Sequence, residues 1–532
     1  MRTSLIEALQ NPDRYPHRVD RVELLETHIS WVLLAGDRVY KLKKPLNLGF
    51  LDFSTLERRR FFCEEELRLN QRTAPDLYLD VVAIRGTPEN PSFEGTGEVI
   101  EYAVRMRRFG ADAGFDQLLS QHRLRGEHII GLGRKLAELH RIAGVAGPDS
   151  NFGTASAAAE PIRDNFTDLA RTLKDAPVAQ GLTSLQTWTE AEIGRLAPLM
   201  EQRHRDGFIR ECHGDAHLGN VALINGEAIL FDCVEFSSEL RWIDLISDVA
   251  FAVMDLHRCG EQGFAWLLLD EYLAVTGDYR GLQLLPLYMV HRALVRAKVT
   301  ALRLEDTDID RDALLNEVHV YLELARKISS QNRPVIIITM GLSGSGKSWL
   351  AQQLVERVGL VRLRSDVERK RLHGVSQSDS SDSAIDSDLY STEATQRTYR
   401  HLAEMARPLI DAGIPCLIDA ACLKHWQRGV FRELASELGV PFGILHCHAG
   451  NATLRQRIVA REAVGNDPSE AGLEVLEHQQ QTLEALNAQE LTQALLIDTG
   501  SDIDSNSGDN TASAADWVSQ LTLDGIGHIA AT

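Results

Sequence analysis

Apolar and polar residues alternate over two neighbouring stretches near the start of the chain, and the pattern predicts a β-hairpin. The alternation runs over residues 19–33, breaks at Gly36-Asp37 and resumes over residues 39–43. A predicted helix follows at residues 62–70, and residues 264–328 are almost wholly helical in pattern. This order predicts a small lobe with strands and one helix, followed by a larger helical region.

The second half of the chain has a different pattern, in which short apolar runs alternate with helical sequence. The first run, over residues 335–339, is rich in β-branched residues, as expected of a fully buried strand. The runs lie at residues 335–339, 360–363, 414–418, 442–447 and 495–498. A polar connector at residues 329–333 separates the two patterns. We therefore predict one domain over residues 1–330 and an α/β domain over residues 331–532.

Composition narrows the class of protein. The chain has 532 residues and a net charge of −20, which argues against general binding to nucleic acids or anionic membranes. Its seven cysteines are scattered without C-x-x-C spacing, so we expect a reduced, cytoplasmic setting and no structural zinc. No apolar run reaches the roughly 18 residues that a membrane span needs. No pattern indicates an oligomeric state.

The strongest motif joins the first predicted strand of the second half to the helix after it. Residues 341–348 read GLSGSGKS and fit the P-loop pattern G-x-x-x-x-G-K-[ST]. Glycines let backbone N–H groups approach phosphates, a lysine reaches the β- and γ-phosphates, and a serine ligates Mg²⁺. The alternative is a plain Gly/Ser turn with a surface lysine. The predicted ATP-binding residues are Gly341, Ser343, Gly344, Ser345, Gly346, Lys347 and Ser348, with Ser348 also a metal ligand.

Two aspartates end later strands of the same half. Asp366 follows the second strand, where it would take a proton from a substrate hydroxyl, and Arg369 would bind an anionic or polar substrate. The alternative for Asp366 is an N-cap on a helix with a basic face. Asp419 ends the third strand and would orient Mg²⁺ in a Walker-B-like role. Ser/Asp-rich residues 374–388 and polar residues 501–513 are predicted to be a loop and a linker.

A predicted helix further on presents two arginines on one face. Arg457 and Arg461 are spaced i, i+4. On a lid helix they would clamp the transferring phosphoryl group. The alternative is a solvated basic face.

In the first half, lysines on a strand precede glutamates on a helix. Lys41 and Lys43 share one strand face, and a kinase-like lobe would use such a lysine to hold the ATP phosphates. We assign that role to Lys41. Its helix partner stays open between Glu65 and Glu66. The alternative is a pair of lysines on a solvated edge.

A polar segment later in the first half carries three groups that phosphoryl transfer needs. Asp215 would accept or orient the attacking hydroxyl, whereas Asn220 and Asp232 would hold Mg²⁺. The Asp-to-Asn interval matches the kinase catalytic loop, with Gly214 in place of its arginine. The alternative is a polar turn between strands with a packed His213.

The motif H-G-D-x-H-x-x-N, followed by a strand and Asp232, resembles the aminoglycoside phosphotransferase and choline kinase superfamily. The resemblance implies a two-lobed, protein-kinase-like α+β fold. It also implies that Asp244 and Asp248 brace the catalytic loop. No G-x-G-x-x-G precedes Lys41, and residues 34–37 are the expected substitute over the phosphates.

The second half resembles small P-loop kinases such as gluconate kinase, chloramphenicol phosphotransferase, polynucleotide kinase and zeta toxins. The shared pieces are the P-loop, the Ser-Asp-x-x-Arg of residues 365–369 and the arginine helix. The whole chain resembles bacterial fusions of an aminoglycoside phosphotransferase-like domain with a P-loop kinase domain of the AAA ATPase type. The resemblance implies a bifunctional enzyme that uses Mg²⁺ and ATP to phosphorylate small-molecule hydroxyl groups. The alternative is an ATP-sensing regulator in which one half binds nucleotide without turnover.

Overall fold

The computed structural model describes residues 2–49, 51–174, 177–305, 310–330, 334–374, 391–464, 472–500 and 510–522. The predicted loop, connector and linker at residues 374–388, 329–333 and 501–513 lie mostly outside these ranges. The chain divides into two compact units. The first comprises residues 1–175 and 189–255, and the second comprises residues 176–188 and 256–532.

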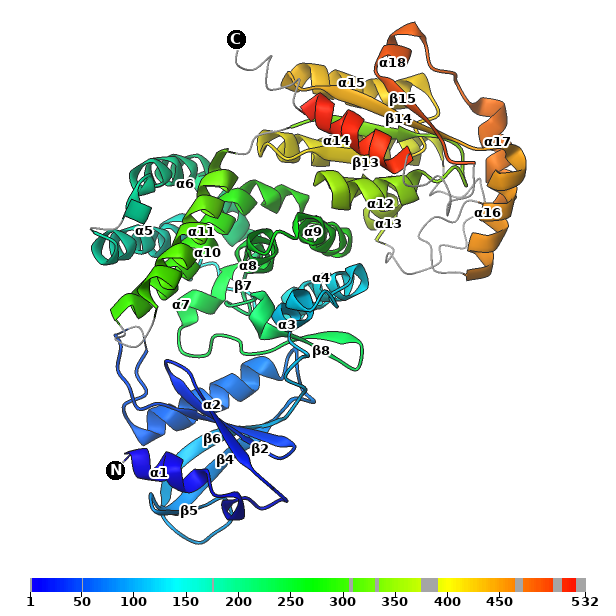
Figure 1. The fold of residues 1–532 in the computed structure, drawn as a ribbon. Helices are drawn as coiled ribbons and strands as arrows, with labels where there is room; N and C mark the ends of the chain where they lie inside the picture. Colours follow the sequence, from blue (N-terminus) through cyan, green and yellow to red (C-terminus); the bar gives the residue numbers. More distant parts are fainter. Residues whose placement is uncertain are drawn as a thin grey trace. The chain divides into compact units, whose positions relative to one another are not determined.

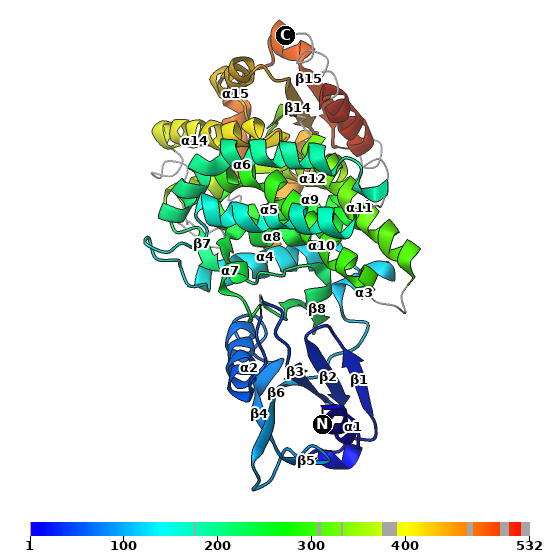
Figure 2. The ribbon, with the colours of Figure 1, turned by 90° about the vertical axis from the view of Figure 1, so that its left-hand side faces the viewer.

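The first unit contains a six-stranded antiparallel sheet in the order β1-β2-β3-β6-β4-β5. Its strands are β1 (Val22–Glu26), β2 (Ser30–Ala35), β3 (Arg38–Lys43), β4 (Tyr78–Thr87), β5 (Asn90–Ser92) and β6 (Val99–Arg107). Helix α2 (Leu56–Asn70) packs on one face of the sheet and α1 (Arg2–Leu9) on the other, each over its own apolar cluster (Figure 2). The predicted turn at Gly36-Asp37 is confirmed, but the stretch of residues 19–33, expected as one strand of the hairpin, contains β1 and the start of β2, which pair antiparallel with each other.

The rest of the first unit is mostly helical and carries two small antiparallel sheets of two strands each. Its helices are α3 (Phe115–Ser120), α4 (Gly126–Ile142), α5 (Ala155–Thr172), most of α6 (Leu182–Arg205), α7 (Ser238–Arg241) and most of α8 (Leu245–Arg258). Its strands are β7 (Ile209–Glu211), β8 (Val221–Ile224), β9 (Glu227–Leu230) and β10 (Trp242–Asp244). Strand β7 pairs with β10, and β8 pairs with β9. Residues 212–220 connect β7 to β8, so each end of this segment is anchored in a different small sheet.

The second unit is built on a five-stranded parallel sheet in the order β12-β13-β11-β14-β15 (Figure 1). Its strands are β11 (Ile336–Met340), β12 (Val361–Arg364), β13 (Cys416–Asp419), β14 (Phe442–His448) and β15 (Ala494–Asp498). All five residues of the central strand β11 are buried, because helices cover both faces of a parallel sheet. The predicted parallel α/β fold is confirmed.

Helices connect these strands. They are α12 (Lys347–Val358), α13 (Ser365–Leu372), α14 (Thr392–Asp411), α15 (His425–Leu438), α16 (Asn451–Val464), α17 (Leu473–Thr482) and α18 (Ala488–Thr492), with a final helical stretch at residues 510–522. None of the helices in the described ranges combines the length and apolar composition that a membrane crossing requires.

Three helices before the sheet also belong to the second unit. They are α9 (Gln262–Thr276), α10 (Leu285–Leu302) and α11 (Arg311–Ser330). A Cβ added to Gly263 of α9 would lie 2.8 Å from the Glu356 carbonyl oxygen of α12, and Trp266 packs on the apolar core of the sheet. The second compact unit therefore starts well before residue 331. The predicted boundary itself falls at residues outside the described ranges and stays a prediction.

Candidate functional site

The P-loop wraps tightly between β11 and α12. Gly341 has φ +152°, and a Cβ there would lie 2.3 Å from the Cys447 carbonyl oxygen. Gly344 has φ +79°, and its Cβ would lie 2.7 Å from the Leu454 carbonyl oxygen. Only glycine fits both positions without moving backbone. Helix α12 begins at Lys347 with no side-chain cap, so its first N–H groups suit an anion.

Polar groups of the chain itself occupy part of this cradle. The Lys347 ammonium donates to the Leu342 carbonyl oxygen at 2.8 Å, and burial lowers the pKa of Lys347. The Ser343 N–H donates to the Gln479 amide oxygen of α17 at 2.8 Å. The Ser345 hydroxyl is buried without a hydrogen-bond partner. A phosphate would satisfy donors of this kind and would restore the charge balance of a buried lysine.

The residues proposed for Mg²⁺ lie together at the start of α12. The Ser348 hydroxyl donates to Asp419 Oδ1 at 3.2 Å, whereas Asp419 Oδ2 is buried and has no hydrogen-bond partner among the described residues. Burial raises the pKa of Asp419. A hydroxyl and a carboxylate with one unsatisfied oxygen fit the oxygen-ligand preference of Mg²⁺, which keeps several waters.

Asp366 is the second residue of α13, and Arg364 holds the N-cap position, so the alternative of an N-cap aspartate is wrong. The Asp366 carboxylate accepts from the Arg364 guanidinium at 3.2 Å and from the Val367 N–H at 2.9 Å. Burial acts to raise the pKa of Asp366, but Arg364 and the Val367 N–H hold it below its ordinary value. Asp366 is therefore ionised at neutral pH.

The two arginines of α16 face the P-loop rather than bulk solvent. Arg457 donates to the Thr499 carbonyl oxygen at 2.6 Å and to the Gly344 carbonyl oxygen at 3.3 Å. One pocket is lined by all the predicted site residues of the second half except Gly341 and Ser345. Its lining includes Ser343, Gly344, Gly346, Lys347, Ser348, Asp366, Arg369, Tyr399, Asp419, Lys424, Gln427, Arg457, Arg461 and Gln479.

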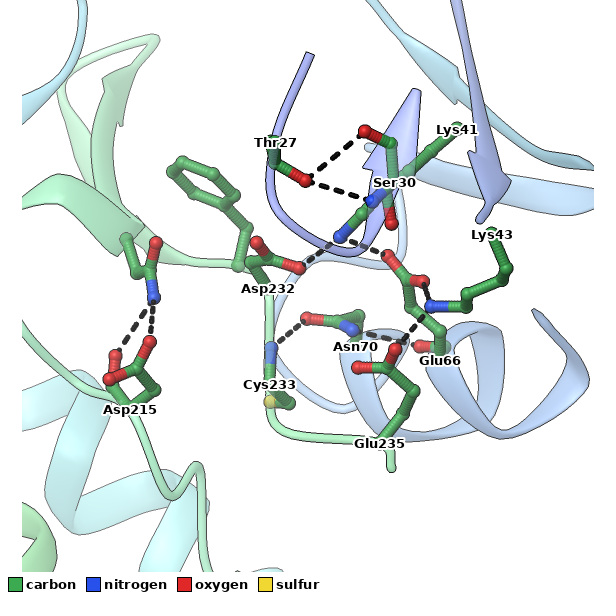
Figure 3. A network of polar contacts seen from close by, with 12 residues as sticks. Thr27, Ser30, Lys41, Lys43, Glu66, Asn70, Asp215, Asp232, Cys233 and Glu235 are labelled. Atoms are coloured by element: carbon green, nitrogen blue, oxygen red, sulfur yellow. Dashed lines mark hydrogen bonds and ion pairs between the residues drawn. The ribbon is translucent and has the colours of Figure 1, made fainter. Parts of the chain in front are cut away.

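In the first unit, the lysine–glutamate pair forms and selects one glutamate (Figure 3). Lys41 lies 2.9 Å from Glu66 Oε1 and also donates to Asp232. Glu65 instead pairs with Arg68 at 2.8 Å. Lys41 is only 12% exposed, so the alternative of a solvated lysine edge is wrong.

Two residues absent from the predicted site join this network. Lys43 is fully buried and pairs with both Glu66 and Glu235 (Figure 3). Burial acts to lower the pKa of Lys43, but these two carboxylates raise it. The available signals were weak: Lys43 shares a strand face with Lys41, and Glu235 follows Asp232 by three residues.

The segment of residues 212–220 is held as a rigid loop. The Asn220 amide donates to the Asp215 carbonyl oxygen at 2.9 Å and to its carboxylate at 3.1 Å. Asp248 accepts from the N–H groups of His213 at 3.0 Å and Gly214 at 2.8 Å, so its predicted bracing role is confirmed. Asp244, which was expected to brace the same loop, instead accepts from Arg203 of α6 at 2.7 Å and so ties β10 to that helix.

Asp232 lies directly after β9 with φ +64°, and its carboxylate is engaged by Lys41. The expected phosphate cover at residues 34–37 is at the far end of the hairpin, where Ala35 pairs with Arg38. The turn before β2 lies at the other end of that strand, where Ser30 pairs with Lys43 and the Thr27 hydroxyl accepts from the Ser30 N–H (Figure 3). Among the described residues, the Ser30 hydroxyl in this turn is buried without a hydrogen-bond partner.

A kinase-like lobe with a lysine–glutamate pair and a parallel-sheet domain with a P-loop together define the class of phosphoryl-transfer proteins. The comparisons with known proteins agree. Residues 54–285 match the family model described as "Phosphotransferase enzyme family", and residues 302–486 match the one described as "AAA domain". The chain thus carries a region that matches a phosphotransferase family model, followed by a region that matches an AAA domain model, in the order that the sequence resemblance predicted.

Two relatives align with most of the chain. An uncharacterized protein of Mycobacterium tuberculosis, Rv2004c, is 28% identical over 452 residues, which cover 84% of this chain and 87% of that protein. An uncharacterized protein of Mycobacterium bovis matches to the same extent.

Solved structures resemble either part of the chain. A choline/ethanolamine kinase family protein from Mesorhizobium loti has a TM-score of 0.39 at 13% identity, covering 62% of this chain and 96% of that one. A gluconokinase from Sinorhizobium meliloti has a TM-score of 0.27 at 18% identity, covering 36% of this chain and 97% of that one.

Proposed function

We propose that the chain is a bifunctional phosphotransferase that uses Mg·ATP to phosphorylate hydroxyl groups of small molecules at two separate sites. The family of each half supports phosphoryl transfer. The observation that carries the proposal is the pocket of the second unit, where Lys347, Asp366 and Asp419 converge from three different strand ends. Convergence at the carboxyl ends of parallel strands is the usual place for a ligand site in such a sheet.

At the second site, each group has a distinct task. The P-loop N–H groups and Lys347 would bind the ATP phosphates, and Ser348 with Asp419 would hold Mg²⁺, which neutralises phosphate charge when bound. Asp366 would accept or orient the hydroxyl proton of the acceptor. Arg457 and Arg461 would stabilise charge on the transferring group. Arg369 and its basic neighbours in the pocket would favour an acceptor with anionic or polar groups.

At the first site, Lys41 would hold the α- and β-phosphates once they displace its present contact with Asp232. Asp232 and Asn220 are then free to hold Mg²⁺, and Asp215 accepts or orients the acceptor hydroxyl. Glu66 keeps Lys41 in place in both states.

All seven cysteines are free, which supports the predicted cytoplasmic location.

The test is ADP release by the full chain over a panel of small alcohols, sugars and sugar acids. Asp215→Asn should abolish the turnover of one set of acceptors, and Lys347→Ala that of another. Suppose that one variant leaves all acceptor-dependent turnover intact, while the half of the chain that carries the substitution still binds ATP. That half is then a nucleotide sensor instead. If neither variant affects turnover, the proposal is refuted.

A further inference from the structure

A buried arginine lies beside the P-loop metal residues and is held by a helix from the other family region. Arg362 is the second residue of the edge strand β12 and is 7% exposed. Asp270 of α9, 5% exposed, contacts it at two points, with Nη2–Oδ2 at 2.7 Å and Nε–Oδ1 at 3.3 Å. Residue 270 falls in the span that matches the phosphotransferase family, whereas residue 362 falls in the AAA span.

The same guanidinium also lies beside Ser348 and Asp419, the two residues that carry the candidate Mg²⁺ ligands. Its Nη1 donates to the Ser348 carbonyl oxygen at 3.4 Å and lies 3.9 Å from Asp419 Oδ2. This is the carboxylate oxygen that has no hydrogen-bond partner. Arg362 therefore stands between two carboxylates, bonded to Asp270 and just out of hydrogen-bond range of Asp419.

The charge of the buried Arg362 guanidinium is balanced by Asp270. A buried guanidinium without a carboxylate partner is costly, so it moves to the nearest anion. Here that anion is Asp419, and a shift of about 1 Å would bring the two groups to ordinary hydrogen-bond distance. An arginine bonded to Asp419 Oδ2 would neutralise the carboxylate and occupy the oxygen available to the metal.

We propose that Asp270 is a positioning residue that restrains Arg362 and so keeps Asp419 available for the divalent cation of the P-loop site. The P-loop half then depends on a helix that belongs by sequence to the preceding family region. Helix α13 helps to hold α9 in place for this role, because Arg371 of α13 donates to the Ala274 carbonyl oxygen of α9 at 2.5 Å. The inference rests on the proposed Mg·ATP site in this half.

The test measures binding of a fluorescent ATP analogue to the full chain as a function of free Mg²⁺. Signal that disappears in the Lys347→Ala background is assigned to the P-loop site. Asp270→Asn should raise the Mg²⁺ midpoint about 10- to 100-fold, the scale seen when a group that orients metal ligands is lost. Binding of the analogue in EDTA should change by less than about twofold, since Asp270 contacts no part of the phosphate cradle.

Two double variants separate positioning from a purely structural role. Asp270→Asn with Arg362→Gln removes the released charge and should return the Mg²⁺ midpoint to within about threefold of wild type. Asp270→Asn with Gln352→Glu should do the same, because Gln352 already accepts from Arg362 Nη2 at 2.8 Å and a glutamate there supplies a new carboxylate. This second variant also keeps the proposal testable if Asp270→Asn alone does not fold.

Asp244→Asn is the matched control, since it breaks another buried Arg–Asp pair but lies in the first unit. It should lower the melting temperature without moving the Mg²⁺ midpoint. An unchanged midpoint in folded Asp270→Asn, or a raised midpoint that persists in both double variants, overturns the inference. A wild-type chain with no Lys347-dependent nucleotide binding overturns both the inference and the proposed function of this half.

Discussion

Replacing Asp366 by asparagine tests whether the second site performs acid–base chemistry. The change keeps the side chain's size and removes its charge. It should leave α13 intact, because Asp366 is not the N-cap of that helix. The lost ion pair with Arg364 should lower stability, because the two side chains are only 16% and 24% exposed and the arginine keeps its charge. A fall in transfer rate is therefore a chemical effect only where circular dichroism and the melting temperature show that Asp366→Asn is folded.

The size of that fall follows from the basicity of the carboxylate. Removing a general base slows a reaction by about 10²–10⁴-fold. Because Arg364 keeps the pKa of Asp366 below its ordinary value, Asp366 is a weak base, so we expect the lower end, about 10²-fold. In the wild type, Asp366 is active as the anion, so transfer should persist at mildly acidic pH and fall only as the pH drops through that lowered pKa.

The assay measures nucleotide affinity and acceptor-dependent ADP release separately. Asp366→Asn should bind ATP within about twofold of wild type, because Asp366 makes no bond to the P-loop backbone. Lys347→Ala is the contrasting variant, since it should weaken ATP binding and slow transfer together. Wild-type turnover in Asp366→Asn would refute the catalytic role, and an equal loss of affinity and turnover would show that Asp366 acts on the nucleotide instead.

Three further predictions concern the first site and the division of the chain. Asp215→Asn should retain ATP binding and lose transfer at the first site, whereas Asp232→Asn should weaken Mg·ATP binding; unimpaired turnover in both variants would contradict the assignment. Burial acts to raise the pKa of Glu66, but Lys41 and Lys43 hold it below its ordinary value, so the contribution of Glu66 to stability is complete at pH values above that ordinary value and is lost as the pH falls below it. Urea unfolding should therefore lose its pH dependence in that window in Glu66→Gln, and an unaltered profile would argue against the buried pair. Finally, a fragment of residues 256–532 should resist urea better than one of residues 331–532, which lacks three helices of the same compact unit; equal midpoints would support the boundary at residue 331.

Local patterns in the sequence were enough to locate the candidate residues of each half. The P-loop is recognisable because its glycines, lysine and serine act through backbone geometry over eight consecutive residues. Apolar runs with no polar face predicted the parallel sheet, because strands covered on both sides need no polar face. The interval between Asp215 and Asn220 similarly fixes two groups on one short loop, where the structure places them in contact.

Tertiary structure alone decided which partners these groups meet. Glu65 and Glu66 are equivalent in sequence, and only the packing of α2 against the sheet turns Glu66 to Lys41. Asp270 and Arg362 are 92 residues apart, and no periodicity in either element relates them. A sequence pattern reports which face of an element is buried, but the partner across that face depends on how distant elements pack. The division of the chain follows the same logic, since α9 joins the P-loop unit through contacts made on folding and not through its position in the chain.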